Sequence, residues 1–299
     1  MRWLARGGER LGLSCRTLVH DGALRCCLTL APKPVGPEKR ALLLVLHGGA
    51  GNPLAAARVT RFHEIAAREN FIVAYPGGAG PSLRHAVWNA GGAHVDGWAE
   101  ERGVDDVGFI RKLIGSLSKA FAIDDERIYV AGMSKGAMMA YRLALEASDL
   151  IAAIAAVAGP MCEEPVSASP RPVAVLHIHG ARDRNVPFSG GRGPFTRRAA
   201  SWPSSEETLA YWRDVNQATE DRAETMNGMM RRSSRSLSGH DVELILLEKR
   251  GHEWPSPRAP MFFRRLLGTA PKDRMDASEE IWRFLRDKRR SGPDIATPS

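Results

Sequence analysis

The chain has 299 residues, of which 43% are hydrophobic and 25% are charged, and its formal net charge is +8. This is the composition of a globular protein, and the length allows one large α/β domain or two smaller ones. The longest promising apolar run, Leu150 to Cys162, is short against the roughly 20 residues that a membrane-spanning helix needs, so no membrane association is expected.

The positive charge does not by itself predict a nucleic-acid partner. Lys and Arg are scattered, with small clusters at 231–235 and 286–290, and no basic helix face is interleaved with aromatic residues. We expect a basic surface without a nucleic-acid site. The N-terminal segment lacks the unbroken apolar stretch of a signal peptide, because Arg6, Glu9 and Arg10 interrupt it, so the sequence as written predicts a cytoplasmic protein.

The four cysteines predict neither a metal site nor a redox site. No C-x-x-C spacing occurs, and Cys26 and Cys27 are adjacent, an arrangement in which two cysteines rarely pair with each other. We expect reduced thiols that pack as small hydrophobic groups.

The first predicted strand, residues 41–49, is a continuous apolar run ending in glycines, which is typical of a strand buried in a parallel sheet. A helix is predicted over 55–70 from its apolar spacing, followed by a strand over 71–76. The glycine-rich stretch 77–98 predicts a loop over the rim of the sheet. An amphipathic helix follows over 104–121, with two aspartates suited to its positive N-terminal end.

Strands and helices continue to alternate along the rest of the chain. The predicted strands are 127–131, 151–159 (assigned by its position), 171–180 and 241–248. The predicted helices are 135–146, 204–216 with Ser204 or Ser205 as N-cap, and 276–290 capped by Asp276.

This alternation predicts an α/β fold, a mostly parallel central sheet with helices on both faces. No repeat and no strong linker is found, so residues 1–290 are expected to form one domain. The stretch 221–239, rich in Arg, Ser and Met, predicts a mobile insertion, and 291–299 predicts a disordered tail.

The pattern Gly132-x-Ser134-x-Gly136 lies between a predicted strand and a predicted helix. In such a sheet, ligands gather at the carboxyl ends of the strands. A G-x-S-x-G turn there holds a serine in a strained, exposed conformation from which it can attack a carbonyl. Ser134 is therefore the candidate nucleophile, although Gly and Ser are also common turn residues.

A serine nucleophile needs a base and an orienting carboxylate, which follow it in the order acid and then histidine in this arrangement. His252 comes just after the last predicted strand and is the candidate base. Asp183 follows the preceding strand and is the candidate acid, whereas Glu248 still lies in the last strand, too close to His252.

Three other histidines are expected to have structural roles. His177 and His179 lie inside a predicted strand and are expected to pack or hydrogen-bond there, and His47 begins a glycine turn. The oxyanion of the tetrahedral intermediate needs backbone donors, for which we predict the amides of Gly49 and Lys135.

These residues together resemble the α/β-hydrolases of the polyhydroxybutyrate depolymerase and feruloyl esterase type. The resemblance runs from about Leu42 to Leu285. It rests on the segments LLLVLHGG, VWNAGG, VDDVGFIRKLI, RIYVAGMSKGAMMAYRLA, HIHGARDRNVPFSGG, VELILLEKRGHEWP and DASEEIWRFL. It implies the nucleophile at Ser134, the acid at Asp183 and the base at His252.

The resemblance also implies an oxyanion turn at His47–Gly49 and substrate contacts by Trp88, Asn89 and Trp254. It implies no metal and no organic cofactor. Many similar proteins are extracellular, and many have cysteines where this chain has Ala93 and His94, so no disulfide is expected there. Lys135 stands where a neutral residue is frequent, and a cation beside the nucleophile predicts a preference for acidic substrates.

The predicted function is hydrolysis of carboxylic esters, such as hydroxybutyrate oligomers, feruloyl esters or other short acyl and aryl esters, through an acyl-enzyme. A serine peptidase or an acyltransferase could use the same residues, and a hydrolase-fold binding protein without catalysis is a further alternative. The sequence leaves the acyl group, the alcohol and the oligomeric state open.

Overall fold

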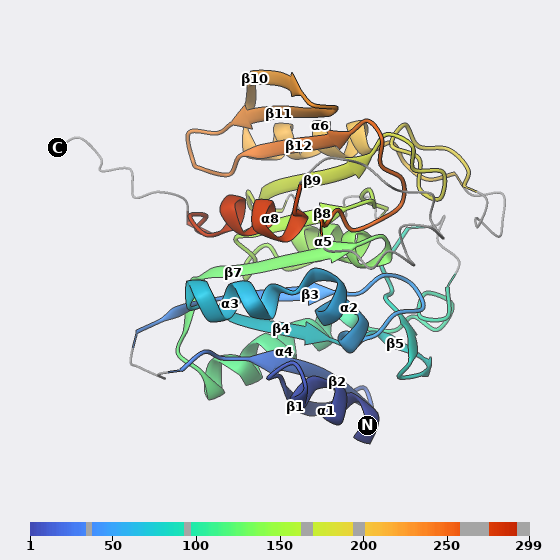
Figure 1. Cartoon of the computed structure of the whole chain (residues 1–299), viewed down its shortest axis with the longest axis vertical. Coiled ribbons are helices and arrows are strands. Elements are labelled where there is room, and N and C mark those ends of the chain that lie inside the picture. Colours follow the sequence, from blue (N-terminus) through green and yellow to red (C-terminus); the bar gives the residue numbers. More distant parts are fainter. Residues whose placement is uncertain (34–37, 93–96, 163–169, 194–200, 258–274, 292–299) are drawn as a thin grey trace.

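The computed structural model describes residues 1–33, 38–92, 97–162, 170–193, 201–257 and 275–291. Its centre is a sheet with the strand order β1-β2-β4-β3-β7-β8-β9-β12-β11-β10 (Figure 1). The middle strands, from β4 to β12, pair in parallel, and the strands at both edges pair antiparallel. The predicted mostly parallel sheet of an α/β-hydrolase fold is confirmed.

The strands of the main sheet are β1 (Ser14–His20), β2 (Ala23–Leu30), β3 (Arg40–Leu46), β4 (Ile72–Pro76), β7 (Ile123–Met133), β8 (Ala153–Val157), β9 (Ala174–Gly180), β10 (Thr219–Met226), β11 (Met229–Arg235) and β12 (Val242–Leu247). A separate hairpin consists of β5 (Ala79–Ser82) and β6 (His85–Val87). The helices are α1 (Arg2–Glu9), α2 (Pro53–Thr60), α3 (Phe62–Glu69), α4 (Asp106–Ala120), α5 (Lys135–Glu146), α6 (Ser205–Asn216) and α8 (Ala277–Leu285).

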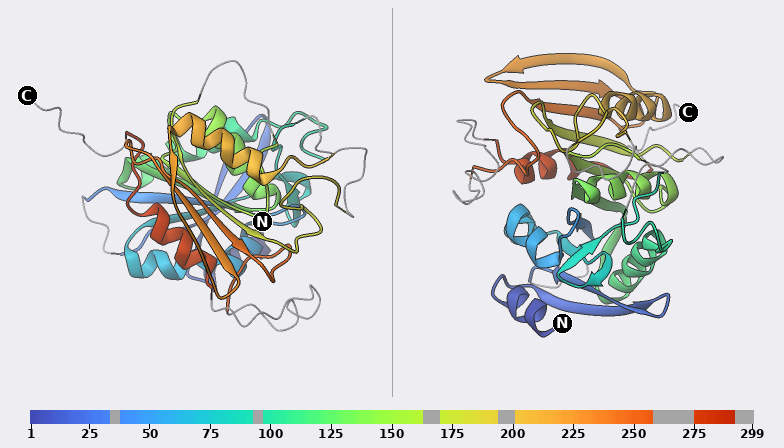
Figure 2. Two further views of the ribbon diagram at one scale, coloured as in Figure 1. Left: turned by 90° about the horizontal axis from the view of Figure 1, so that it is seen from above. Right: turned by 90° about the vertical axis from the view of Figure 1, so that its right-hand side faces the viewer.

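Helices cover both faces of the sheet (Figure 2). Side chains alternate along each strand, so β3 sends Leu42 and Leu44 to one face and Leu43 and Val45 to the other. The first pair packs in the core with α4, α5 and α6, and the second pair packs with α1, α2, α3 and α8. The continuous apolar run of β3 is therefore explained by burial on both faces.

Several predicted helix boundaries are confirmed by their caps. Ser204 caps α6 in a capping box with Glu207, and the Asp276 side chain accepts the Ser278 N–H at the start of α8. Of the two aspartates expected at the start of α4, only Asp105 caps the helix. Its neighbour is buried and has a different role, described below.

The predicted helix 55–70 is two helices, α2 and α3, because Arg61 between them adopts φ 54° and interrupts the helical geometry. The stretch predicted as a rim loop, 77–98, contains the β5–β6 hairpin. The antiparallel strands β1 and β2 at one edge of the sheet were not predicted.

The prediction of a mobile insertion over 221–239 is wrong. This part of the chain forms most of the β10–β11 hairpin, which continues the sheet from β12. Its turn is Asn227–Gly228, with φ 53° and 76°, the backbone that a two-residue hairpin turn requires. The predicted tail lies outside the described residues beyond Ser291.

No helix in the described ranges is long and apolar enough to cross a membrane. In the described ranges, Cys15, Cys26, Cys27 and Cys162 form no disulfide. Burial raises the pKa of Cys26 to about 11, so this thiol stays protonated at neutral pH, as expected of a cysteine that only packs.

Candidate active site at the carboxyl edge of the sheet

Ser134 occupies a sharp turn between β7 and α5, at the edge where the parallel strands end (Figure 1). Its backbone has φ 55° and ψ −120°, which residues other than glycine rarely adopt. The Ser134 N–H donates a hydrogen bond of 2.8 Å to the carbonyl of Val157 at the end of β8. This strained strand–turn–helix geometry is the one that presents a serine nucleophile in α/β-hydrolases.

The glycines on either side of Ser134 are required by close backbone contacts. A Cβ atom at Gly132 would lie 2.2 Å from the carbonyl oxygen of Gly136. A Cβ atom at Gly136 would lie 2.4 Å from the carbonyl oxygen of Leu46 at the end of β3. Any side chain at these two positions would push α5 away from the strands that position Ser134.

Asp183 and His252 are in direct contact, although 69 residues separate them. His252 Nδ1 lies 2.7 Å from Asp183 Oδ2, and the Asp183 side chain is fully buried. The other carboxylate oxygen accepts the N–H groups of Asn185 and Val186, each at 2.9 Å. A carboxylate at Nδ1 requires the proton on that nitrogen, which leaves Nε2 of His252 free to accept a proton.

The Asp183 carboxyl is held ionised by its partners. Burial alone would raise its pKa, but hydrogen bonds from His179 and His252, together with the Val186 N–H, hold the pKa below its usual range. The negative charge is therefore present at neutral pH to stabilise a protonated His252.

A chain of buried hydrogen bonds continues from Asp183 into the core. His179 Nε2 lies 2.8 Å from the Val186 carbonyl oxygen and 3.4 Å from Asp183 Oδ2. His179 Nδ1 lies 2.9 Å from His177 Nε2, and His177 Nδ1 lies 2.9 Å from the Tyr141 hydroxyl. His177 and His179 were predicted to pack or hydrogen-bond within their strand; the bond between the two rings confirms this, and further bonds reach Val186 and Tyr141 outside the strand.

The proton on one nitrogen of this chain is set by its partners. His179 Nε2 faces only oxygen acceptors, so it carries a proton, and His179 Nδ1 lies near both His177 Nε2 and the Ser205 hydroxyl, the latter at 3.4 Å. Burial, and then the proximity of His179, lowers the pKa of His177 well below its usual value, which keeps that ring neutral.

Ser134 lies at the same edge as this pair but is not hydrogen-bonded to it. It follows β7, whereas Asp183 follows β9 and His252 follows β12, and these strands are neighbours in the sheet through β8. Among the described residues, no hydrogen bond joins the Ser134 hydroxyl to His252. The structure thus brings two of the three predicted catalytic residues into contact and places the third at the edge they share.

The glycine turn after β3 lies against Ser134 and Lys135. A Cβ atom at Gly48 would lie 3.7 Å from the Ser134 Cβ, and one at Gly49 would lie 3.9 Å from the Lys135 Cβ. The Gly48 carbonyl accepts the Gly51 N–H at 3.1 Å, which closes the turn. The Gly49 and Lys135 amides predicted as oxyanion donors thus belong to two backbone segments that lie close together.

His47 supports this glycine turn and is not available as a base. Its Nδ1 lies 2.8 Å from the Gly48 carbonyl, and its Nε2 accepts the Gly78 N–H at 3.0 Å. Burial lowers the pKa of His47 from 6.5 to about 4, so the ring is neutral at neutral pH. The predicted structural role of His47 is confirmed.

The Lys135 side chain does not present a free cation beside Ser134. Its ammonium group forms an ion pair with Glu100, and both side chains are nearly buried, with 9% and 10% of their surface exposed. The pair carries no net charge, so the structure argues against the predicted preference for acidic substrates through Lys135.

The substrate contacts predicted for Trp88 and Asn89 do not fit their surroundings. Trp88 is fully buried, and its Nε1–H donates to the His47 carbonyl at 2.9 Å. The Asn89 amide donates to the Val104 carbonyl at 2.9 Å, and the Asn89 N–H donates to Asp106. Trp88 thus stabilises the glycine turn after β3, and Asn89 stabilises the start of α4.

The predicted substrate contact by Trp254 does not fit its surroundings either, because the residue is only 5% exposed and belongs to the core that α1, α2, α3 and α8 cover. It packs edge-on against Phe62 of α3 and donates to the Ser278 hydroxyl of α8 at 3.1 Å. A tryptophan near a catalytic motif in the sequence can point into the site or into the core. The sequence alone therefore could not show that these two rings are buried.

The contacts of two buried or nearly buried acidic residues were not predicted from the sequence. Asp106 is fully buried, forms a 2.5 Å ion pair with Arg25 of β2, and accepts the Asn89 N–H. Glu100 neutralises Lys135. Both contacts join parts of the chain that are distant in sequence, so no local pattern indicates them. By contrast, His177 and His179 lie two residues apart in one strand, and Asp183 follows four residues after His179. This spacing could have indicated the buried chain of hydrogen bonds that ends at Asp183.

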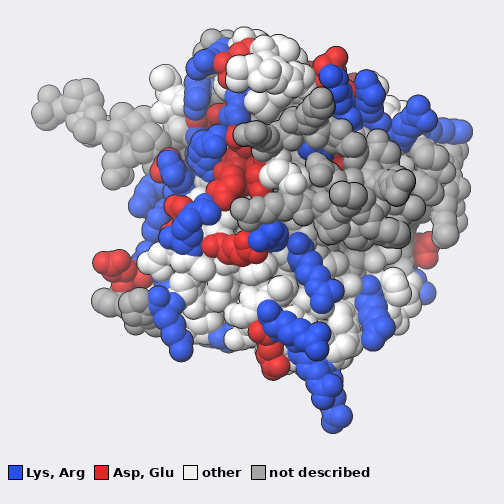
Figure 3. Space-filling model, viewed as in Figure 1, with Lys and Arg blue, Asp and Glu red and all other residues white. Residues whose placement is uncertain are grey.

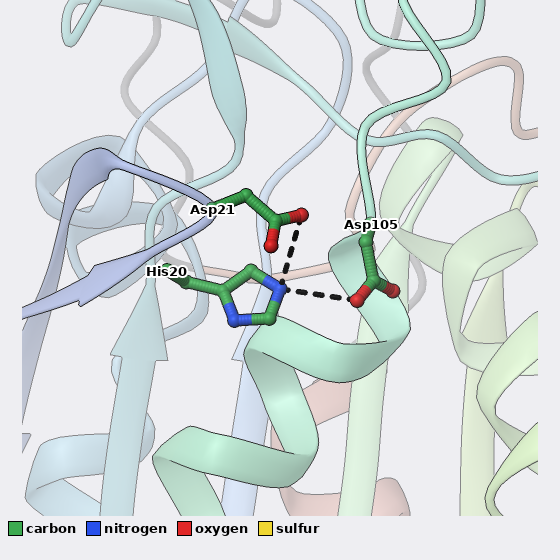
Figure 4. Close-up of side chains that lie close together, drawn as sticks. All are labelled: His20, Asp21 and Asp105. Carbon is green, nitrogen blue, oxygen red and sulfur yellow. Dashed lines mark hydrogen bonds and ion pairs between the residues drawn. The ribbon is translucent and has the colours of Figure 1, made fainter.

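One group in the described ranges has side chains of the kind that ligate metals: His20, Asp21 and Asp105 (Figure 4). His20 Nε2 lies 3.1 Å from Asp105 and 3.7 Å from Asp21. Asp105 already accepts the Gly108 N–H as the cap of α4. A protonated Nε2 shared by two exposed carboxylates satisfies this group without an ion, and the group connects the β1–β2 turn to α4.

Comparison with known proteins agrees with this geometry. A family model described as Esterase PHB depolymerase matches residues 24–186, more than half of the chain. The putative esterase NocK of Nocardia uniformis subsp. tsuyamanensis is 30% identical over 244 residues, 76% of this chain and 69% of that protein. A poly(3-hydroxybutyrate) depolymerase of Ralstonia pickettii is 30% identical over 139 residues, but these are only 28% of its length and 44% of this chain.

Among solved structures, an acetyl xylan esterase from Aspergillus awamori superimposes with a TM-score of 0.59 and 14% identity, covering 86% of this chain and all of that one. At this identity the match supports the fold. The family model and the NocK relative go further, since they match the sequence over most of the sheet. The chain belongs to the Esterase PHB depolymerase family and is a carboxylic ester hydrolase of the α/β-hydrolase fold.

Proposed function

We propose that this esterase is a serine hydrolase in which Ser134 is the nucleophile, His252 the general base and Asp183 the residue that orients His252. The observation that carries the proposal is the 2.7 Å contact between His252 and a buried, ionised Asp183. This contact lies at the sheet edge where Ser134 has the strained backbone of a nucleophile turn.

In the first half of the reaction, Ser134 Oγ attacks the carbonyl carbon of the ester while His252 Nε2 takes the hydroxyl proton. The carbonyl π electrons move to oxygen, and the resulting oxyanion accepts hydrogen bonds from the Gly49 and Lys135 amides. When the intermediate collapses, the C–O bond to the alcohol breaks. His252 gives its proton to the leaving oxygen, and an acyl-Ser134 ester remains.

In the second half, His252 takes a proton from water, and the hydroxyl oxygen attacks the acyl-Ser134 carbonyl. The second oxyanion accepts hydrogen bonds from the same backbone amides. When this intermediate collapses, the bond between the acyl carbon and Ser134 Oγ breaks, and Ser134 Oγ regains a proton from His252. The carboxylic acid leaves. Asp183 stays ionised and stabilises the imidazolium in both halves.

The proposed substrates are small esters: hydroxybutyrate oligomers, feruloyl esters or other short acyl and aryl esters. The names of similar proteins support this range, because they include a hydroxybutyrate polymer depolymerase, a bifunctional acetylxylan esterase/xylanase and probable feruloyl esterases. Each of these matches covers about a third or less of that relative, so the choice among substrates needs measurement.

The test is hydrolysis of a chain-length series of aryl esters, methyl ferulate and hydroxybutyrate oligomers by wild type and by Ser134→Ala. We expect the variant to keep the fold and to lose at least about a thousandfold in kcat, as for removal of a nucleophile in a triad. Wild-type-like turnover by a folded Ser134→Ala variant would show that another group carries the reaction.

A further inference from the structure

A hollow of about 600 Å³ lies where α1, the start of α2 and the tip of the β5–β6 hairpin meet. Its walls come from three parts of the chain. The residues that line it are Trp3, Arg6, Gly7, Arg10, Asn52, Leu54, Ala55, Arg58, Arg84 and His85. None of the catalytic or oxyanion residues proposed above is among them.

Four arginines line this hollow, and no acidic residue does. Within the ranges that the structure describes, neither Arg6 nor Arg10, nor Arg58 nor Arg84, forms an ion pair. Four like charges around one hollow repel one another, and that repulsion is relieved when an anion binds between them. We refer to this feature as the arginine hollow.

In a second hollow on the same molecule, basic side chains are paired with acidic ones. It has about 400 Å³ and lies between β11, β12 and α8. There, Arg231 pairs with Glu243 and with Glu280, and Arg283 also pairs with Glu280. In Figure 3, red and blue side chains alternate in the region of α8 and β12, whereas the side chains over α1 and α2 at the lower right are mainly blue.

The walls of the arginine hollow are held by specific contacts. Asn52 accepts the Ala55 N–H at the start of α2, and its amide donates to the Arg84 carbonyl at 3.1 Å, which ties the hairpin tip to the helix. The Arg84 guanidinium lies over the Trp3 ring, 5.3 Å from its centre. A Cβ atom at Gly7 would lie 2.4 Å from a methyl carbon of Leu54, so α1 and α2 pack directly on each other.

We propose that the arginine hollow binds a small organic oxyanion, a carboxylate or phosphate on an apolar or aromatic body. Guanidinium groups form paired, charge-assisted hydrogen bonds with both kinds of oxyanion. The Trp3 ring and the Leu54 side chain supply an apolar wall for the rest of the molecule. The volume lies within the range of small-molecule sites.

The test is calorimetric titration of the full chain at low ionic strength with three probes of similar shape: benzoate, phenyl phosphate and neutral benzamide. We expect saturable binding of at least one anion and none of benzamide, and weaker anion binding as NaCl is raised. The two anions separate a carboxylate from a phosphate preference. Absence of saturable binding by both anions would overturn the proposal.

Variants of the lining arginines test whether the anion binds in the arginine hollow. Replacing two arginines on different walls, Arg58→Gln with Arg84→Gln, is expected to weaken binding at least about tenfold, because two charge-assisted contacts are lost. The pair Arg6→Gln with Arg10→Gln on α1 tests the same hollow without touching the hairpin. The matched control is Arg283→Gln with Arg286→Gln, which removes two charges elsewhere and should leave binding unchanged.

Equal binding by wild type and by both pairs of arginine-hollow variants would place the anion elsewhere, for instance at the catalytic edge, and would refute the site. Hydrolysis of a neutral aryl ester by the same variants is measured in parallel. Since none of the four arginines belongs to the proposed catalytic machinery, failure of the anion site and failure of the serine mechanism give different results.

Discussion

At the scale of single residues, the site depends on two different physical constraints. Glycines at 132 and 136 are needed because backbone atoms of neighbouring elements occupy the space of a side chain. His179 and Asp183 are needed because buried polar groups must find partners. The first constraint can be tested through stability, and the second through the kinetics of the reaction.

Replacement of Gly136 by Ala should destabilise the protein by about 2–4 kcal/mol, because the new methyl group meets the backbone of β3 and overpacks the contact. The added Cβ would lie 2.4 Å from the Leu46 carbonyl oxygen. The free energy of unfolding is measured in urea. The matched control is Gly115→Ala on the exposed face of α4, where no atom lies within 4 Å and where helix propensity predicts a gain of about 0.5–1 kcal/mol.

Replacement of His179 by Ala should lower kcat about tenfold or more and leave KM nearly unchanged, because Asp183 loses a buried partner and holds His252 less well. His179→Gln keeps an N–H donor at the same reach and should recover part of kcat. A buried histidine away from the site, His63, supplies the control: His63→Ala should lower stability while kcat stays near the wild-type value. Equal kcat losses in both His179 variants would indicate a packing role alone.

The contact between Asp183 and His252 could be predicted because chain order alone assigns both residues to the ends of neighbouring parallel strands. The orientation of Trp88 and Trp254 could not be predicted in this way. Both rings lie near catalytic motifs in sequence, but the packing of the whole edge turns them into the protein, toward His47 and Phe62 respectively. The order of the strands determines which residues lie at the edge of the sheet. Whether a side chain there is buried depends on how the complete core packs.

At the scale of elements, the β10–β11 hairpin shows why polar edge strands are difficult to recognise. Its strands, TEDRAETM and MMRRSSR, are rich in charged and polar residues and have no strong apolar face, which is typical of the edge of a sheet. The stabilising contacts are distant in sequence: Arg232 pairs with Glu206 of α6, and Arg231 pairs with Glu280 of α8. The buried strands of the parallel part of the sheet, in contrast, carry their apolar signal locally and were predicted.

The turn of this hairpin can be tested by one substitution. Gly228 has φ 76°, where a residue with a Cβ is strained, so Gly228→Ala should lower the free energy of unfolding by about 1 kcal/mol. The control is Asn227→Gly at the neighbouring position, φ 53°, which relieves any strain there and should have little effect. Both are measured by urea unfolding at one pH, and a neutral Gly228→Ala would mean that the turn adapts.

At the scale of the whole molecule, the buried histidines make stability depend on pH. Burial lowers the pKa of His47 to about 4, and burial also lowers the pKa of His63, of His177 and of His240. In the unfolded chain these rings have an ordinary pKa near 6.5. As the pH falls below about 6.5, the unfolded chain therefore binds protons that the folded chain does not bind, and the folded state loses stability.

The free energy of unfolding should accordingly be nearly constant between about pH 7.5 and 8 and decline between about pH 6.5 and 4.5, by up to about 1.4 kcal/mol per pH unit for each ring that stays neutral when folded. Below about pH 4 a second decline is expected, because hydrogen bonds and ion pairs offset the effect of burial and lower the pKa of Asp183 and Asp241. His63→Gln removes one titrating ring. Between pH 6.5 and 4.5, the free energy of unfolding of this variant should therefore decline less steeply than that of wild type, even if the variant is less stable at pH 7.5. A wild-type curve that stays flat from pH 7.5 to 4.5 would show that the histidines accept protons without unfolding, and that the core around them is open to water.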